Sequence, residues 1–138
     1  MQQPQGDYPQ PVLDDWAPLP VTPEAVQRFQ ANPDNEFRIV AEQDGEIVGF
    51  GALVPENNEL RACYVAPKVS HMGVGTALVR ELERMARARG LPYLQMESSI
   101  TAEPFYKFLG FEVRERGEHT LRSGRRMACV HMRKLLRR

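Results

Sequence analysis

The stretch from Val65 to Leu78 constrains this chain most, because an apolar strand-like segment leads through a glycine-bearing loop into an amphipathic helix. Glycine lets the backbone approach a ligand closely, and the unpaired N–H groups of a first helical turn favour an anion. Gly73 and Gly75 therefore predict a phosphate-binding loop, with a ligand-free strand-to-helix turn as the alternative. A Walker loop needs lysine after Gly75 and a dinucleotide-binding loop needs Gly or Ala at Leu78, so we exclude both.

Two segments resemble the GCN5-related N-acetyltransferase (GNAT) family. Residues 70–75, Ser-His-Met-Gly-Val-Gly, are similar to its acyl-CoA loop, Gln or Arg, two residues, Gly, any residue, then Gly or Ala, with Ser70 at the Gln or Arg position. Residues 98–111 resemble its Asn-Ala-x-x-Phe-Tyr-x-x-x-Gly-Phe segment, with Thr101 in place of Asn. The spacing of the two segments and the element order over about residues 36–133 also fit, so the resemblance covers most of the chain.

The resemblance implies an α/β fold in which helices flank a mixed, mostly antiparallel central sheet with one splayed strand pair. Alternating apolar residues and the turn pair Asp44-Gly45 predict a hairpin. Gly49 and Gly51 in its second strand suggest a bulge or a close approach by a ligand or neighbouring backbone. The predicted strands are 37–43, 46–54, 60–65, 92–98, 111–118 and a hairpin or interface pair at 120–122 and 126–132; the predicted helices are 74–90 and 102–109.

The first 21 residues carry five prolines among Gln and Asp, which predicts a flexible or loosely docked arm. Thr22 and Pro23 then form a good helix start. We expect residues 22–138 to form a single domain, a length that suffices for one core. The strand and helix with which the family usually begins have little room here, so a trimmed front end is expected.

Charge is distributed unevenly along the chain. Residues 1–60 hold eleven acidic and two basic residues, whereas residues 61–138 hold seven acidic and sixteen basic residues. The basic half contains the phosphate loop, and the acidic half favours a cationic co-substrate, with an ordinary solvated surface as the alternative. The Arg-rich face of the helix after Val74, which includes Glu83, is predicted to be solvated.

Cys63 and Cys129 are the only cysteines, and their spacing fits neither a disulfide framework nor a metal site. We expect a reduced, cytoplasmic protein. The first residues lack the features of a signal peptide, and no apolar run reaches the length of a membrane span, so no membrane partner is expected.

The resemblance implies acetyl-CoA as co-substrate, with no metal. The backbone of Cys63, Tyr64 and Val65 would hold the pantetheine arm, and the amides from Met72 to Thr76 would hold the diphosphate. A backbone N–H would polarise the thioester oxygen. The implied cofactor-binding residues are Cys63, Tyr64, Val65, Ser70, His71, Met72, Gly73, Val74, Gly75, Thr76, Thr101 and Tyr106.

An amine acceptor must lose a proton before it attacks, which costs about 4.6 kcal/mol at pH 7 for a pKa of ~10.4. Glu59 and Glu97 stand where the family places a carboxylate base, and we favour Glu97; either is equally explained as a surface acid at a strand end. His71 and His119 are weaker candidates. Cys63 is predicted to be structural, since a buried apolar thiol is a poor nucleophile.

The resemblance places the Tyr106 hydroxyl near the cofactor sulfur, where it would donate to the leaving thiolate. The alternative is an aromatic residue that only packs.

We therefore predict an N-acetyltransferase that joins an acetyl group to a small-molecule or protein amine in a ternary complex. A non-catalytic acyl-CoA-binding regulatory domain is the first alternative, favoured by Ser70 and the short front end. A nucleic-acid-binding module that uses the basic half is a weaker one. The acceptor's identity is not fixed by the fold, and a homodimer is left open.

Overall fold

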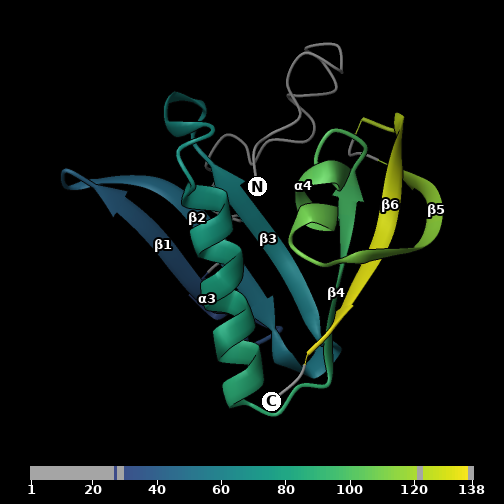
Figure 1. Ribbon diagram of the computed structural model, residues 1–138, viewed down its shortest axis with the longest axis horizontal. Helices are drawn as coiled ribbons and strands as arrows, with labels where there is room; N and C mark the ends of the chain where they lie inside the picture. Colours follow the sequence, from purple (N-terminus) through teal and green to yellow (C-terminus); the bar gives the residue numbers. More distant parts are fainter. Residues whose placement is uncertain (1–26, 28–29, 121–122, 137–138) are drawn as a thin grey trace.

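The computed structural model describes residue 27, residues 30–120 and residues 123–136 (Figure 1). The predicted arm over residues 1–21 and the predicted helix start at Thr22 lie outside these residues, as do Leu121 and Arg122. Gln27, Gln30 and Ala31 are helical. The elements that follow are β1 (Phe37–Gln43), β2 (Glu46–Val54), the 3-10 helix η1 (Pro55–Asn57), β3 (Glu59–Val65), the 3-10 helix η2 (Pro67–Val69), α3 (Val74–Ala88), β4 (Tyr93–Ser99), α4 (Glu103–Phe108), β5 (Glu112–Thr120) and β6 (Arg126–Leu135).

In the described part of the chain the strands form one six-stranded sheet in the order β1-β2-β3-β4-β6-β5. Each neighbouring pair is antiparallel except β3 and β4. The predicted mixed, mostly antiparallel sheet is confirmed, and Figure 1 shows α3 and α4 against the same face of it. The predicted β1–β2 hairpin also forms. Asp44 and Gly45 both have positive φ, the conformation that a two-residue turn of this hand requires.

The parallel strands β3 and β4 are paired at one end only. Glu59 lies opposite Gln95, whose backbone N–H donates to the Asn58 carbonyl at 2.8 Å. Beyond this point the strands diverge toward their carboxyl ends (Figure 1). The predicted splayed pair is therefore confirmed, and α4 and the N-terminal end of α3 lie at the wide end of the divergence.

Helix α3 packs on the β1–β3 half of the sheet. Leu78, Leu82 and Ala86 are buried, as their spacing predicts. A Cβ atom added at Gly49 would lie 3.0 Å from Leu78 Cδ1, and one added at Gly51 would lie 3.1 Å from Leu82 Cδ1. The predicted close approach at these glycines is therefore made chiefly by α3 side chains. A bulge also adjoins Gly49, because the β1–β2 register shifts between Ala41, opposite Gly49, and Glu42, opposite Ile47. The β2–β3 register shifts between Ala52 and Leu53.

Glu83 was expected on the solvated face of α3, and this prediction is wrong. Its side chain is 1% exposed and accepts a hydrogen bond from Lys134 Nζ at 2.9 Å. Lys134 also donates to the Leu109 carbonyl at 2.8 Å. A buried carboxylate needs such a partner because its desolvation alone costs several kcal/mol. Since Lys134 belongs to β6, this ion pair ties α3 to the far side of the β3–β4 divergence.

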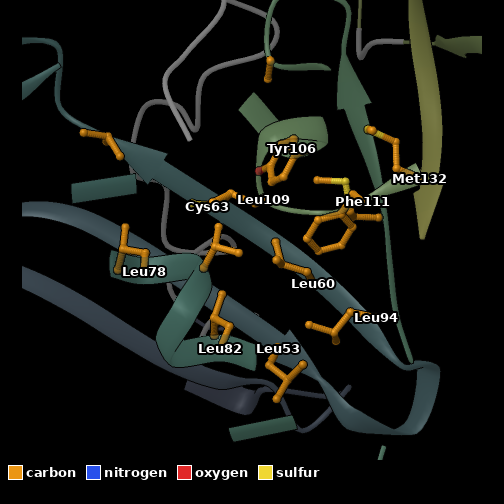
Figure 2. Close-up of a cluster of buried hydrophobic side chains, with 14 of the residues drawn as sticks. Leu53, Leu60, Cys63, Leu78, Leu82, Leu94, Tyr106, Leu109, Phe111 and Met132 are labelled. Atoms are coloured by element: carbon orange, nitrogen blue, oxygen red, sulfur yellow. The ribbon is translucent and has the colours of Figure 1, made fainter. Parts of the chain in front are cut away.

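The core is continuous beneath both helices (Figure 2). Tyr106 of α4, and Leu109 directly after this helix, pack with Phe111, Leu94 and Met132 on one side of the divergence. None of the helices in the described residues is long and apolar enough to cross a membrane.

Candidate active site

The loop between β3 and α3 lines a pocket of about 450 Å³, which we call the loop pocket. It gathers seven of the predicted cofactor-binding residues from two parts of the chain that are distant in the sequence, residues 65–76 and Thr101. Tyr64, Ser70 and Met72 are not part of its lining. The lining residues are Val65, Val69, His71, Gly73, Val74, Gly75, Thr76, Thr101, Ala102 and Phe105.

Gly73 lines this pocket and is the N-cap residue of α3, so the N-terminus of the helix faces the pocket. It caps the helix with φ +84°, a left-handed conformation that other residues adopt at a cost of about 1–2 kcal/mol. The N–H groups of a first helical turn have no intrahelical partner. No side chain caps α3 at this end, so these N–H groups are available to a ligand. The Met72 N–H already donates to the Val69 carbonyl at 3.2 Å, which narrows the predicted set of amides to Gly73–Thr76.

A second hollow of about 800 Å³, which we call the strand cleft, lies along β3 and β4. It brings together Glu59, Glu97, Cys63 and Tyr106 of the predicted site. The lining residues are Glu56, Asn57, Asn58, Glu59, Leu60, Arg61, Ala62, Cys63, Tyr93, Gln95, Met96, Glu97, Tyr106, Cys129 and His131.

Strand β3 and helix α4 contribute to both hollows. Cys63 lines the strand cleft and Val65 lines the loop pocket, while Tyr106 and Phe105 do the same from α4. The wide end of the β3–β4 divergence therefore lies between the two hollows. An extended molecule that spans both hollows would run between β3 and α4, along a path that we call the β3–α4 passage.

The Tyr106 side chain is fully buried between α4 and β3 (Figure 2). Burial, and next the adjacent Cys63 thiol, raise the pKa of Tyr106 well above its ordinary value. The contact with Cys63 does not have hydrogen-bond geometry, and the hydroxyl makes no hydrogen bond to any residue that the structure describes. A buried hydroxyl without a partner costs about 1–3 kcal/mol, so this position suits a ligand atom that accepts a hydrogen bond.

The charge of the strand cleft is predominantly negative. Its one guanidinium in the lining, Arg61, pairs with Asp34 at 2.6 Å, Glu36 at 3.3 Å and Glu59 at 3.0 Å. Hydrogen bonds from Arg61 to Glu59 and Asp34 raise the pKa of Arg61 further above its ordinary value. Glu97 projects from β4 as an exposed side chain of the same cleft.

Both cysteines line the strand cleft, and neither is in a disulfide. Burial raises the pKa of the Cys63 thiol, as predicted. Burial, followed by the charges of Glu97 and Glu118, raises the pKa of Cys129. Both thiols therefore stay protonated and are weak nucleophiles. Within the described residues, no three His, Cys, Asp or Glu side chains are placed to hold a metal ion.

The sequence reasoning did not include His131, which the structure places in the strand cleft directly opposite Glu97. Nothing in the local sequence around His131 indicates this neighbour, since the two residues are 34 positions apart. The available signal is the alternation of β6, in which His131 lies between the buried residues Val130 and Met132. The register between β4 and β6 is also required, and it follows only from the fold.

Comparison with known proteins decides the family. The sequence model of the acetyltransferase (GNAT) family matches residues 4–111, most of the chain. The chain belongs to the GNAT family. A curated relative, described as an IAA acetyltransferase of Azospirillum brasilense, is 32% identical over 88 residues, which cover 59% of this chain and 57% of that relative. The match thus spans little more than half the length of that relative.

Solved structures agree with this GNAT assignment. A GCN5-related N-acetyltransferase from Rhodopseudomonas palustris, described as an aminotransferase of class II, superposes with a TM-score of 0.78 at 27% identity, covering 94% of this chain and 78% of that one. An aminoglycoside 6'-N-acetyltransferase solved with coenzyme A superposes with a TM-score of 0.65 at 19% identity, covering 84% and 79%. The second likeness, at that identity, concerns the fold alone.

Proposed function

We propose that this GNAT protein transfers the acetyl group of acetyl-CoA to an amine by direct attack in a ternary complex. Family membership supports acetyl transfer in general. The arrangement that favours the direct form is the placement of two hollows, one rich in backbone donors and one acidic, at the two sides of the β3–α4 passage. Both substrates would then be bound at once, with their reacting atoms meeting in the divergence.

The residues present fit acetyl-CoA. The left-handed Gly73 and the first turn of α3 offer N–H donors to a diphosphate without an intervening Cβ. The backbone of Cys63 and Val65 would bond the pantetheine arm on the side of β3 from which β4 has diverged. The Tyr106 hydroxyl, which has no hydrogen-bond partner among the described residues, lies at the passage, where a sulfur or thioester oxygen would accept its hydrogen bond.

Protein groups in the strand cleft would promote the loss of a proton from the acceptor. An ammonium of pKa ~10.4 must lose a proton before its nitrogen can attack a carbonyl carbon. Glu97 is our first candidate for the carboxylate that assists, directly or through water. Glu59, which lines the same cleft from β3, is the second candidate.

Tyr106 would assist when the C–S bond breaks. Its raised pKa keeps the phenol protonated, so it acts as a hydrogen-bond donor and never as a base. A donor that faces the developing thiolate stabilises charge that is absent in the ground state, which is the condition for catalysis.

We further propose a cationic amine as the acceptor. The carboxylates of Glu56, Glu59 and Glu97 line the strand cleft, and its Arg61 is neutralised by its acidic partners. Such a cleft concentrates cations. Two cysteines without a disulfide suit a reducing compartment, and we propose the cytoplasm.

The test is release of free CoA thiol from acetyl-CoA in the presence of a panel of amines, polyamines and peptide N-termini, with DNA titrated in parallel. Amine-dependent thiol release without DNA binding is expected. Tight acetyl-CoA binding without release by any amine would indicate the non-catalytic regulatory domain, for which the serine at position 70 is the supporting observation. DNA binding without acetyl-CoA binding would contradict the proposal altogether.

A further inference from the structure

Three ionisable residues form a row across the neighbouring strands β4, β6 and β5. We call these residues, Glu97, His131 and Glu115, the acid–histidine row. His131 of β6 lies opposite Glu97 of β4 and opposite Glu115 of β5. Directly opposed residues of antiparallel strands point to the same face, with Cβ atoms about 4.5–5.5 Å apart. An imidazole therefore stands between two carboxylates.

The row lies on the face of the sheet that α3 and α4 do not cover. Its neighbours Met96, Val130 and Met132 are buried in the core beneath the helices, and the row residues alternate with them. On β5 the register shifts between Val113 and Glu115. This bulge places Val113 opposite core residue Met132 and Glu115 opposite His131, so it brings the edge carboxylate onto the row's face.

The row leads from the strand cleft to solvent. Glu97 and His131 line the cleft, and Glu115 is exposed on β5, the outermost strand of the described sheet. His131 itself is half-buried. A proton that is taken up inside the cleft can therefore leave at the edge of the sheet without crossing the core.

An imidazole is better matched to an amine than a carboxylate is. Reference pKa values are ~6.5 for imidazole, ~4.3 for a Glu carboxyl and ~10.4 for a lysine-like amine, so the imidazole lies about two units closer to the amine. General-base catalysis is most efficient when the base titrates near the working pH. Two flanking carboxylates stabilise the imidazolium that forms.

Other ionisable groups near His131 are less suited to accept the proton of the amine. Cys129 and Arg133 flank it on β6, and Glu59 and Arg61 face the cleft from β3. Burial, followed by the charge of Glu97, raises the pKa of Cys129, so this thiol keeps its proton. The same effect indicates that the charge of Glu97 acts on residues of β6. Glu59 and Arg61 are bonded to each other at 3.0 Å.

We propose that His131 accepts the proton of the acceptor amine, with Glu97 and Glu115 holding the resulting imidazolium and passing the proton to solvent. This inference rests on the proposed function. The freed nitrogen lone pair forms the C–N bond as the thioester C–S bond breaks, and the sulfur keeps the electron pair. An ammonium loses two protons in becoming an amide: one leaves through His131, and the other ends on the CoA thiol.

The test compares the pH dependence of kcat/KM for the amine in wild type, His131→Gln, Glu97→Gln and Glu115→Gln. In His131→Gln we expect a loss of about a hundredfold at pH 7 and disappearance of the acidic limb of the wild-type profile. In Glu97→Gln we expect a smaller loss of about tenfold, with the acidic limb kept, because His131 remains and only one carboxylate partner of its imidazolium is lost. The affinity for acetyl-CoA should stay at the wild-type value in each variant, which also reports that the variant is folded.

Glu118→Gln is the matched control for Glu115→Gln, since Glu118 is an exposed acid of the same strand that pairs with Arg126 and lies opposite Ala128. It should leave the pH profile unchanged. As a second readout, His131→Ala in the 800 Å³ cleft should regain rate on addition of free imidazole, an effect that a merely structural histidine would not show.

Wild-type turnover together with an unchanged pH profile in folded His131→Gln would overturn the assignment of His131 while leaving the proposed function intact. Loss of the limb in Glu97→Gln alone would do the same and make Glu97 the base. No thiol release by the wild type with any amine would overturn the proposed function, and this assignment with it.

Discussion

The loop pocket and the strand cleft lie at the two sides of one passage, yet they are built from different parts of the chain. The loop pocket depends on backbone, on a left-handed Gly73 and on the first turn of α3. The strand cleft depends on side chains of β3, β4 and β6 that the sheet register brings together. A site made of backbone is specified by a short contiguous motif, whereas a site made of side chains is specified by the whole fold.

The difference also concerns tolerance to substitution. Ser70 stands where the family commonly has Gln or Arg, but the N–H groups of the α3 terminus do not depend on that side chain. In the strand cleft, exchange of one residue alters its partners as well, as the Arg61 cluster shows with its three carboxylates. Substitutions in the loop pocket should therefore change binding, and substitutions in the cleft should change the rate.

The largest effect is expected for Gly73→Val. The new Cβ would enter the open space that the loop pocket offers, and the left-handed φ would be strained. Loss of two backbone amide bonds to phosphate, each worth about 1.5–3 kcal/mol, predicts at least a hundredfold loss of acetyl-CoA affinity in calorimetric titration. Gly75→Val should have a similar effect.

Gly90→Val is the matched control for Gly73→Val, because Gly90 has φ +75° and open space around its Cβ position at the opposite end of α3. It should lower the melting temperature to a similar degree and leave acetyl-CoA affinity unchanged. Equal affinities for folded Gly73→Val and Gly90→Val would remove the loop pocket from cofactor binding.

Tyr106→Phe should change the rate of transfer and not the binding of acetyl-CoA, the reverse of Gly73→Val. We expect the single-turnover rate to fall about a hundredfold while acetyl-CoA affinity is nearly unchanged. Because the hydroxyl is buried without a hydrogen bond to a described residue, its removal should leave thermal stability equal or slightly higher. A clear loss of stability at an unchanged rate would instead assign Tyr106 to packing.

Helix α4 borders both sites, so loosening it should affect them together. Arg116, and then Lys107, lower the pKa of the Glu103 carboxyl to about 2 from an ordinary 4.5. Because the folded-state pKa is the lower one, this contribution to stability is complete above about pH 4.5 and is lost as the pH falls toward 2.

Glu103→Gln should therefore melt a few degrees lower than wild type at pH 7, with the gap closing between pH 4.5 and pH 2. It should also reduce acetyl-CoA affinity and transfer rate by similar small factors, in contrast to Gly73→Val and Tyr106→Phe. A gap in melting temperature that stays constant down to pH 2 would contradict the Glu103 pairing with Arg116.

A change of ionic strength should have a smaller effect on the reaction than the substitutions above. Screening at 0.15 M and above weakens attraction between exposed charges, so kcat/KM for a cationic acceptor should fall by about twofold to fivefold when ionic strength is raised from 0.05 to 0.3 M. A neutral amine of the same size is the control. A flat response for both, or activity only on acidic acceptors, would contradict the cationic-acceptor proposal.

The smallest effect is expected for Ser70→Arg, which restores the residue type that the family commonly has. An exposed ion pair contributes about 0.2–1 kcal/mol, so acetyl-CoA should bind no more than about fivefold more tightly. A gain of a hundredfold or more would show that the backbone amides do not dominate the loop pocket.

The sequence predicts much of this fold because its signals are local. Asp44-Gly45 and the flanking alternation specify the β1–β2 hairpin, and the Gly73–Gly75 spacing specifies the start of α3. The burial of Glu83 was not predicted, because its helical position alone indicates a solvated carboxylate. Its partner Lys134 belongs to β6 and lies 51 residues later in the sequence. His131 was missed for the same reason, since its neighbour Glu97 is defined by strand register alone.

The central claim is that one ternary complex joins acetyl-CoA in the loop pocket to an amine in the strand cleft. The most direct measurement is a rapid-quench single turnover with limiting acetyl-CoA and excess amine, in which free thiol, acetylated amine and acetylated protein are followed together. We expect thiol and acetylated amine to form in a 1:1 ratio at the same rate, with no acetyl group on the protein. Thiol release that precedes amide formation, or acetyl-protein that accumulates without amine, would contradict direct transfer.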